Sequence, residues 1–261
     1  MDCGAAKLVP DYTGINALRY DSLQDYNLDV DYYLRVAGAA GRILELGSGT
    51  GRIALPLARA GCKVCALDNS ADMQAVLQSK LDAKTAPLIT QVTASMADFD
   101  INGVFDLAIL GLNTLFALIG EKERKACFAA VHRHLRPGGH FIIDASMPFA
   151  RDAKLLSGAY SFSSETGNDK KPSFCVVRSE YRAKEQLLVG NYLYGSCGSD
   201  GKAELFVTPA AEYHPSPGEL RLLLEGAGFE IAAFDCDYAG TPFADASARQ
   251  DMVVTAISKG E

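Results

Sequence analysis

Three glycines in five residues follow a short apolar run that carries one acidic side chain. The apolar run is residues 43–46, with Glu45 inside it, and the glycines are Gly47, Gly49 and Gly51. Glycine allows a tight turn with positive φ and lets a ligand approach the backbone with no Cβ in the way. A strand, a glycine turn and a helix start in this order are typical of a site for a nucleotide-containing ligand.

A second strand-like run, residues 63–67, ends in Asp68. Asp68 follows the first glycine by about 20 residues, the spacing at which a carboxylate binds ribose hydroxyls in a nucleotide-binding βαβ unit. A dinucleotide loop would place a glycine where this chain has Arg52, and no Gly-Lys-Ser/Thr closes the loop as in a P-loop. A nucleoside with a cationic amino-acid tail fits better than a pyrophosphate, because Glu45 and the turn carbonyls can receive an amine.

Residues 45–51 resemble motif I of the class I S-adenosylmethionine-dependent methyltransferases, and later segments resemble this superfamily in the expected order. Asp68 resembles the acidic residue that ends the second strand. Ala97-Asp98-Phe99 resembles the segment that meets adenine. Residues 105–110 resemble strand four, and residues 135–144 resemble the turn and strand five. Residues 220–229 resemble the last helix with its turn. The ordered set spans most of residues 12–258 and is specific for the superfamily, but not for the substrate.

The resemblance implies a site for S-adenosyl-L-methionine, with S-adenosyl-L-homocysteine as the product and no metal. The residues that it assigns to the cofactor are Tyr20, Glu45, Gly47, Ser48, Gly49, Gly51, Asp68, Asn69, Met73, Ala97, Asp98 and Leu110. Glu45 and the glycines are expected at the methionine part, Asp68 at the ribose and Asp98 at the adenine amino group. Met73 either packs on the adenine or belongs to the core. Tyr20 either covers the cofactor or packs an N-terminal helix.

Asn113 follows the fourth predicted strand, at the edge where ligands bind in open α/β sheets. The run from there is Asn113-Thr-Leu-Phe-Ala-Leu118, whereas similar small-molecule members often have Asn-Ser-Leu-x-His-Leu, so Ala117 stands where histidine is common. This difference favours an acceptor that is already nucleophilic, such as an amine or a ring nitrogen, or a base from another part of the chain. Asn113 and His214 are the predicted catalytic residues, His214 as the base; its alternative role is a structural hydrogen bond.

Residues 146–213 break the alternation of strands and helices and are typical of an inserted antiparallel meander. This region and the next residue carry aromatic and polar side chains that suit a small planar substrate: Tyr181, Arg182, Asn191, Tyr192, Tyr194, Tyr213 and His214. Tyr192 and Tyr194 share a face, because side chains alternate along a strand. The alternative for each residue is packing on the sheet or a contact between subunits.

The elements that position these residues predict an α/β fold with a doubly wound, mostly parallel, seven-stranded Rossmann-like sheet and an inserted antiparallel β meander. The predicted strands are 42–46, 63–67, 88–92, 104–110, 139–145, 229–236 and 251–258. A helix is predicted within 15–40, where Leu28, Tyr32, Tyr33 and Val36 form an apolar stripe, and further helices at 51–60, 71–83, 121–135 and 216–227, with an irregular segment at 1–14 and a turn at 137–139. We expect an N-terminal helical lid segment (1–40), a cofactor-binding core (41–145 and 214–261) and an inserted substrate or lid subdomain (146–213).

The net charge of −7 argues against a nucleic-acid partner, since such partners favour a basic groove. The most apolar run, residues 107–119, is too short to span a bilayer, and residues 1–14 show no signal-peptide pattern. Seven cysteines, an odd number, fit reduced thiols. We therefore expect a cytoplasmic monomer or homodimer with no membrane partner.

The Cys62-x-x-Cys65 pair has no second pair, and His132 and His134 point apart on a helix, so no metal site is predicted.

The predicted activity is methyl transfer from S-adenosylmethionine to a small-molecule acceptor, with nitrogen slightly favoured over oxygen. An in-line displacement needs alignment and exclusion of water more than a catalytic triad. Three alternatives stay open: a module that binds S-adenosylmethionine without turnover, an NAD-dependent oxidoreductase, and a protein methyltransferase.

Overall fold

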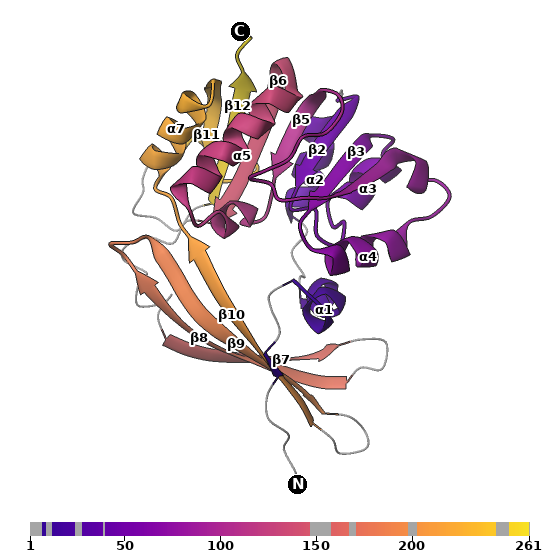
Figure 1. Cartoon of the computed structure of the whole chain (residues 1–261), viewed down its shortest axis with the longest axis vertical. Coiled ribbons are helices and arrows are strands. Elements are labelled where there is room, and N and C mark those ends of the chain that lie inside the picture. The colour runs from indigo at the N-terminus through magenta and orange to yellow at the C-terminus, as the bar shows by residue number, and fades with distance from the viewer. Residues whose placement is uncertain are drawn as a thin grey trace.

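Two β-sheets organise the chain, a seven-stranded sheet with helices on both faces and a five-stranded sheet beyond one end of it (Figure 1). The computed structural model describes residues 7–8, 12–23, 28–38, 40–146, 158–166, 171–197, 203–243 and 251–260. Within them, no helix is both long and apolar enough to cross a membrane.

The larger sheet has the strand order β11-β12-β6-β5-β2-β3-β4. Its strands are β2 (Arg42–Leu46), β3 (Lys63–Asp68), β4 (Ile89–Thr93), β5 (Phe105–Leu110), β6 (Leu135–Ser146), β11 (Phe229–Asp235) and β12 (Asp251–Ser258). Only β12 runs antiparallel to its neighbours; every other strand pair of this sheet is parallel. The predicted mostly parallel, seven-stranded sheet is confirmed.

Apolar strands between two helical layers bury both faces of this sheet, as parallel strands require. Helices α2 (Leu28–Ala37), α3 (Ala54–Arg59) and α4 (Ala71–Lys80) pack on one face, and α5 (Glu121–His134) and α7 (Pro217–Gly226) pack on the other. Short 3₁₀ helices η1 (Ala86–Leu88) and η2 (Thr114–Ala117) follow α4 and β5. Serine N-caps start two helices, because Ser70 accepts from Met73 N and Ser216 accepts from Glu219 N.

Three local predictions differ from the structure. The helix expected within 15–40 is α2, and a second helix that was not predicted, α1 (Ile15–Leu23), precedes it; residues 24–27 lie outside the described residues. The turn predicted at 137–139 lies within β6 as a bulge, where Gly138 takes φ +74° and the pairing with β5 shifts register. Residues 7–8, predicted as irregular, form strand β1 because β10 offers them a parallel partner.

The smaller sheet has the order β1-β10-β9-β8-β7, and its four long strands form an antiparallel meander, as predicted. Its strands are β1 (Lys7–Leu8), β7 (Gly158–Thr166), β8 (Lys171–Arg182), β9 (Leu187–Cys197) and β10 (Ala203–Tyr213). The side chain of Asn16 on α1 donates to Thr208 Oγ1 on β10 at 2.7 Å, so the N-terminal helix ties this sheet to the rest of the chain. The division into lid, core and insert stays a prediction.

Candidate active site

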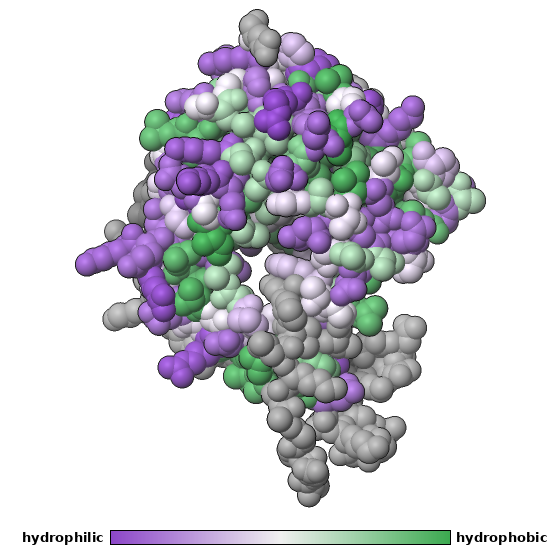
Figure 2. Space-filling view, viewed as in Figure 1, coloured by the Kyte–Doolittle hydropathy of each residue, from purple (hydrophilic) through white to green (hydrophobic). Residues whose placement is uncertain are grey.

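A cavity of about 310 Å³ lies between the two sheets, at the carboxyl ends of β2, β3 and β5. Its walls come from the glycine loop, the loops after β3, β4 and β5, the N-terminal segment and the last residues of β10. Figure 2 shows the surface opening between the helix-covered sheet and the five-stranded sheet. The volume falls in the range of small-ligand pockets, about 300–1,000 Å³.

The three motif glycines have different neighbours, although all take positive φ. Gly47 has φ +65°, and a Cβ on it would lie 2.4 Å from Thr114 Cγ2 across the cavity wall. Gly49 has φ +54° and no atom near its Cβ direction. A Cβ on Gly51 would meet Leu77 Cδ1 at 2.3 Å, in the core. Gly47 and Gly49 line the cavity, whereas the need for glycine at position 51 comes from packing.

Glu45 supplies a buried carboxylate oxygen that has no hydrogen-bond partner in the described part of the chain. The residue is 3% exposed and lines a small recess next to the cavity, together with Gly47 and Tyr20. Burial raises the pKa of Glu45 to about 8, against the opposing charge of Arg52. A cationic amine in this recess would give the oxygen a partner, so the site fits the amino-acid tail of S-adenosylmethionine.

Arg52 occupies the position where a dinucleotide loop carries a glycine. Its guanidinium donates to both carboxylate oxygens of the buried Asp29, each at 2.6 Å. The pair fixes α2 against the glycine loop through a bidentate contact.

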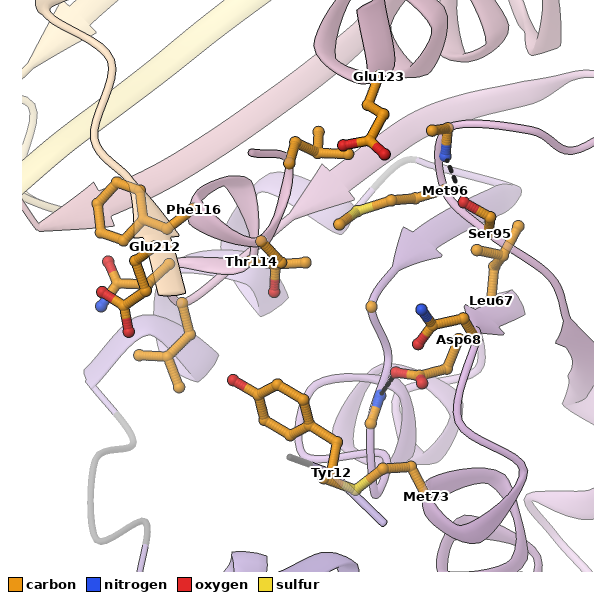
Figure 3. A pocket seen from close by; sticks show the side chains of 18 of the residues that line it. Tyr12, Leu67, Asp68, Met73, Ser95, Met96, Thr114, Phe116, Glu123 and Glu212 are labelled. Carbon is orange, nitrogen blue, oxygen red and sulfur yellow. Dashed lines mark hydrogen bonds between the residues drawn. The ribbon is translucent and has the colours of Figure 1, made fainter. Parts of the chain in front are cut away.

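Asp68 closes the glycine loop onto the end of β3. Its Oδ2 accepts from Gly49 N and its Oδ1 from Ser70 N, both at 2.8 Å, and the first of these bonds is drawn in Figure 3. Burial raises the pKa of Asp68 while the two N–H donors lower it. Each carboxylate oxygen has a second lone pair, so the side chain, which lines the cavity, can also accept from ribose hydroxyls.

The other predicted cofactor residues divide into two groups. Tyr20, Asn69, Met73 and Ala97 line the cavity, and the buried Ser48 lines the recess, where its Oγ accepts from Gln74 Nε2. Asp98 and Leu110 do not line the cavity: Asp98 is exposed, and Leu110 belongs to the core. These assignments stay predictions, and the geometry brings the first group together.

The loop after β5 holds two residues other than glycine in the left-handed region. Leu112 has φ +46° and Asn113 has φ +64°, and both line the cavity. Leu112 N donates to Asp144 Oδ1 at 2.5 Å, and Asn113 Oδ1 accepts from Ser146 N at 2.7 Å. Tyr33 donates to the same Asp144, whose pKa burial raises to about 7. Strained backbone that the surrounding structure holds in place is typical of functional sites.

His214, the predicted base, does not line the cavity. It is 6% exposed, and its ring lies 4.0 Å from the ring of Phe116. Its Nε2 lies 3.1 Å from Glu212 Oε2, at hydrogen-bond distance. Glu212 and Phe116 line the cavity instead.

The other meander residues that were predicted for the substrate site contact neighbouring side chains or are exposed. Tyr192 and Tyr194 stack with their rings 6.1 Å apart, which confirms their shared face. Tyr181 packs edge-on against His214, and the Tyr213 hydroxyl donates to Glu219. Arg182 pairs with Glu180, and Asn191 is exposed.

The cavity residues that the sequence did not predict include Tyr12, Met96, Phe116 and Glu212. Phe116 stands in the same run as Ala117. Glu212 lies two residues before His214, and this spacing on a strand would have placed both on one face. Tyr12 is held at the site because its carbonyl accepts from Ser70 Oγ at 2.5 Å. In the described residues, no group of three or more His, Cys, Asp or Glu is placed to hold a metal ion.

Comparisons with known proteins agree with this geometry. The family described as "Methyltransferase domain" matches residues 43–139. A cypemycin N-terminal methyltransferase from Streptomyces sp is 29% identical over 218 residues, which cover 81% of each chain. The putative methyltransferase YqeM from Bacillus subtilis is 32% identical, covering 77% of this chain and 78% of YqeM. The structure of the CcbJ methyltransferase from Streptomyces caelestis has 27% identity and a TM-score of 0.79, covering 96% of this chain and 99% of CcbJ.

Proposed function

This chain belongs to the class I S-adenosylmethionine-dependent methyltransferases, and from that premise we propose that it methylates a nitrogen atom of a small-molecule acceptor. Bound S-adenosylmethionine supplies an electrophilic methyl group on a sulfonium, and the residues of the chain bind, align and exclude water. The observation that carries the nitrogen assignment is the lining of the acceptor end of the cavity.

The cofactor half of the site follows from the described contacts. Glu45 offers its unpartnered oxygen to the amino group of the methionine part. Gly47 and Gly49 let the ligand approach the loop backbone, and Asp68 accepts from the ribose. Met73 and Ala97 lie on the cavity wall, which supports their predicted place beside the adenine. Asp98, exposed at the edge of this wall, stays a prediction for the adenine amino group.

The acceptor half offers one group that can take up a proton, the carboxylate of Glu212, and a carboxylate is a weaker base toward a hydroxyl acceptor than a histidine. In the described part of the chain, the cavity is lined by no histidine, lysine or cysteine, and position 117 is alanine. A hydroxyl acceptor needs a general base in the transition state, whereas an amine attacks with its own lone pair once it is neutral. Asn113 then positions the acceptor beside the strained loop. The Streptomyces relative, named for methylation at an N-terminus, supports transfer to nitrogen.

Several alternatives are weighed against this proposal. The family membership sets aside an NAD-dependent oxidoreductase. A binding module without turnover would keep the recess and the glycine loop and would release no S-adenosylhomocysteine. A protein methyltransferase would accept whole proteins rather than small amines. The net charge of −7 supports an acceptor other than nucleic acid. A cytoplasmic location and a monomeric or homodimeric state stay predictions from the sequence.

The test begins with calorimetric titration of the purified protein with S-adenosylmethionine, and separately with NAD. We expect binding of the first only, and then release of S-adenosylhomocysteine with members of an amine panel but not with the matching alcohols. Asp68→Ala should weaken cofactor binding by about 1–3 kcal/mol, the usual cost of leaving polar partners unpaired. Unchanged affinity in that variant would remove the ribose assignment, and turnover of alcohols alone would overturn the nitrogen assignment.

A further inference from the structure

The cavity carries one carboxylate at the end far from the cofactor residues. We propose that Glu212 selects an acceptor whose amine arrives as a cation, and that His214 is the positioning residue that holds this carboxylate toward the cavity. The inference deepens the proposed function, on which it rests for the location of the acceptor. The ligand class is an amine joined to an apolar or planar body.

The position of Glu212 in the cavity separates it from the cofactor residues. Figure 3 shows Glu212 and Phe116 on the opposite side from Asp68 and Ser95, with Thr114 between them. The neighbouring β10 residues on the wall are Ala210 and Ala211, whose small side chains leave room in front of the carboxylate. Glu212 therefore faces the part of the cavity that an acceptor would enter.

Contacts on both its ring and its backbone hold His214 in place. Its ring packs on Phe116 at 4.0 Å and meets the edge of Tyr181 at 5.9 Å. Its backbone is fixed on both sides by Gln186, whose carbonyl accepts from His214 N and whose Nε2 donates to His214 O, both at 2.9 Å. A carboxylate only accepts hydrogen bonds, so the contact of 3.1 Å places the imidazole N–H on Nε2, donating to Glu212 Oε2.

The other carboxylates on the cavity wall are engaged by backbone donors. Glu123 accepts from Gly120 N at 3.1 Å in the cap of α5, and Asp68 accepts from Gly49 and Ser70. In the described residues, no lysine or arginine forms an ion pair with Glu212. Its carboxylate is half-buried beside apolar Phe116, and its hydrogen-bond partner in the described residues is the imidazole of His214. A ligand ammonium would supply the missing counter-charge through a charge-assisted hydrogen bond. Before transfer the ammonium passes one proton to the Glu212 carboxylate, and the lone pair of the neutral amine then forms the N–C bond as the C–S bond to S-adenosylhomocysteine breaks.

The experiment compares amines with alcohols of the same skeleton. Ethylamine, benzylamine and phenethylamine are titrated beside ethanol, benzyl alcohol and 2-phenylethanol by protein-observed NMR, with and without S-adenosylhomocysteine. The wild-type protein should bind the best amine about 10-fold more tightly than its alcohol, the order expected for a hydrogen bond to a charged group. In Glu212→Gln, which keeps the shape and removes the charge, this preference should disappear.

Glu204→Gln is the matched control, because Glu204 is exposed on the same strand and lies outside the cavity lining. It should keep the preference for amines. Equal binding of amine and alcohol by the wild type, binding of neither, or a preference that survives in Glu212→Gln would each overturn the proposal. If S-adenosylhomocysteine fails to bind while the amine preference depends on Glu212, the proposed function falls and this inference stands. If methyl transfer occurs but the amine preference does not depend on Glu212, the proposed function stands and this inference falls.

Discussion

The two halves of the cavity are built in different ways. The cofactor half is made by loops that directly follow β2, β3 and β4, and its polar groups meet backbone N–H donors of these same loops, as Asp68 does with Ser70 and Gly49. The acceptor half is made by contacts between distant segments, such as Phe116 of η2 against His214 after β10. The first half is fixed by its own local geometry, whereas the second depends on how the smaller sheet docks.

The N-terminal segment joins the two halves. Thr50 Oγ1 of the glycine loop donates to Asp21 at 2.5 Å, and Gly14 N donates to Asp72 at 2.7 Å, which holds the segment on the cofactor half. Asn16 then reaches Thr208 on the smaller sheet. Such a strap can cover the cofactor and set the distance between the two sheets at the same time.

The largest effect should come from a single methyl group in the cofactor half. Gly47→Ala would force a Cβ to within 2.4 Å of Thr114 Cγ2 at φ +65°, so the loop must move. We expect S-adenosylmethionine affinity, measured by calorimetry, to fall about 100-fold from strain of a few kcal/mol. Gly61→Ala is the control, because Gly61 has φ +97° and nothing within 4 Å of its Cβ direction. Gly61→Ala should lower the melting temperature but leave cofactor affinity intact. Equal losses of affinity in the two variants would show that backbone strain alone explains both losses.

A smaller, pH-dependent effect should come from Glu45. Because burial raises its pKa to about 8, the carboxyl is mostly protonated at pH 7 in the free protein, and a cationic amine beside it favours ionisation. Cofactor binding should therefore release a proton, and affinity should rise from about pH 6 to pH 7.5, above which the α-amino group of the ligand loses its own charge. Calorimetry in buffers of different ionisation enthalpy counts this proton. Absence of proton release in the wild type would contradict the assignment.

Glu45→Gln provides the comparison for both binding and stability. The neutral amide should weaken binding about fivefold at pH 7.5 and remove the proton release. The native carboxyl binds a proton more tightly than the unfolded one, so the free energy of unfolding of the free protein falls as pH rises from about 4.5 to about 8. In Glu45→Gln the free energy of unfolding should fall less over this pH range. Part of the fall should remain, because the pKa of Asp144 is also raised, to about 7.

The difference between the halves also explains what the sequence could predict. Glu45, the glycines and Asp68 occur at fixed spacings because one strand, one turn and one helix start create their geometry, so the motif alone located them. Phe116 and Glu212 are 96 residues apart in the sequence and line one cavity only in the folded chain. His214 was predicted as the base from its residue type, yet its ring packs between Phe116 and Tyr181 just after the end of β10, and Glu212 lines the cavity instead. Residues 7–8 became a strand only because β10 was there to pair with them.

The smallest effect tests whether His214 acts through Glu212. His214→Leu removes the donor to Glu212 Oε2 while keeping an apolar group against Phe116, and His214→Gln restores an N–H that can reach the carboxylate. If His214 only positions Glu212, the preference for amines over alcohols should be about threefold smaller in the Leu variant than in the wild type. This change is smaller than the effect of losing one hydrogen bond to a charged group, and the Gln variant should recover the preference. The loss should appear in KM for an amine acceptor and not in kcat, because the imidazole does not face the cavity. A fall in kcat that glutamine fails to restore would instead make the imidazole the proton acceptor. Because His214 does not line the cavity, its side chain could then reach the ligand only after the cavity wall had moved.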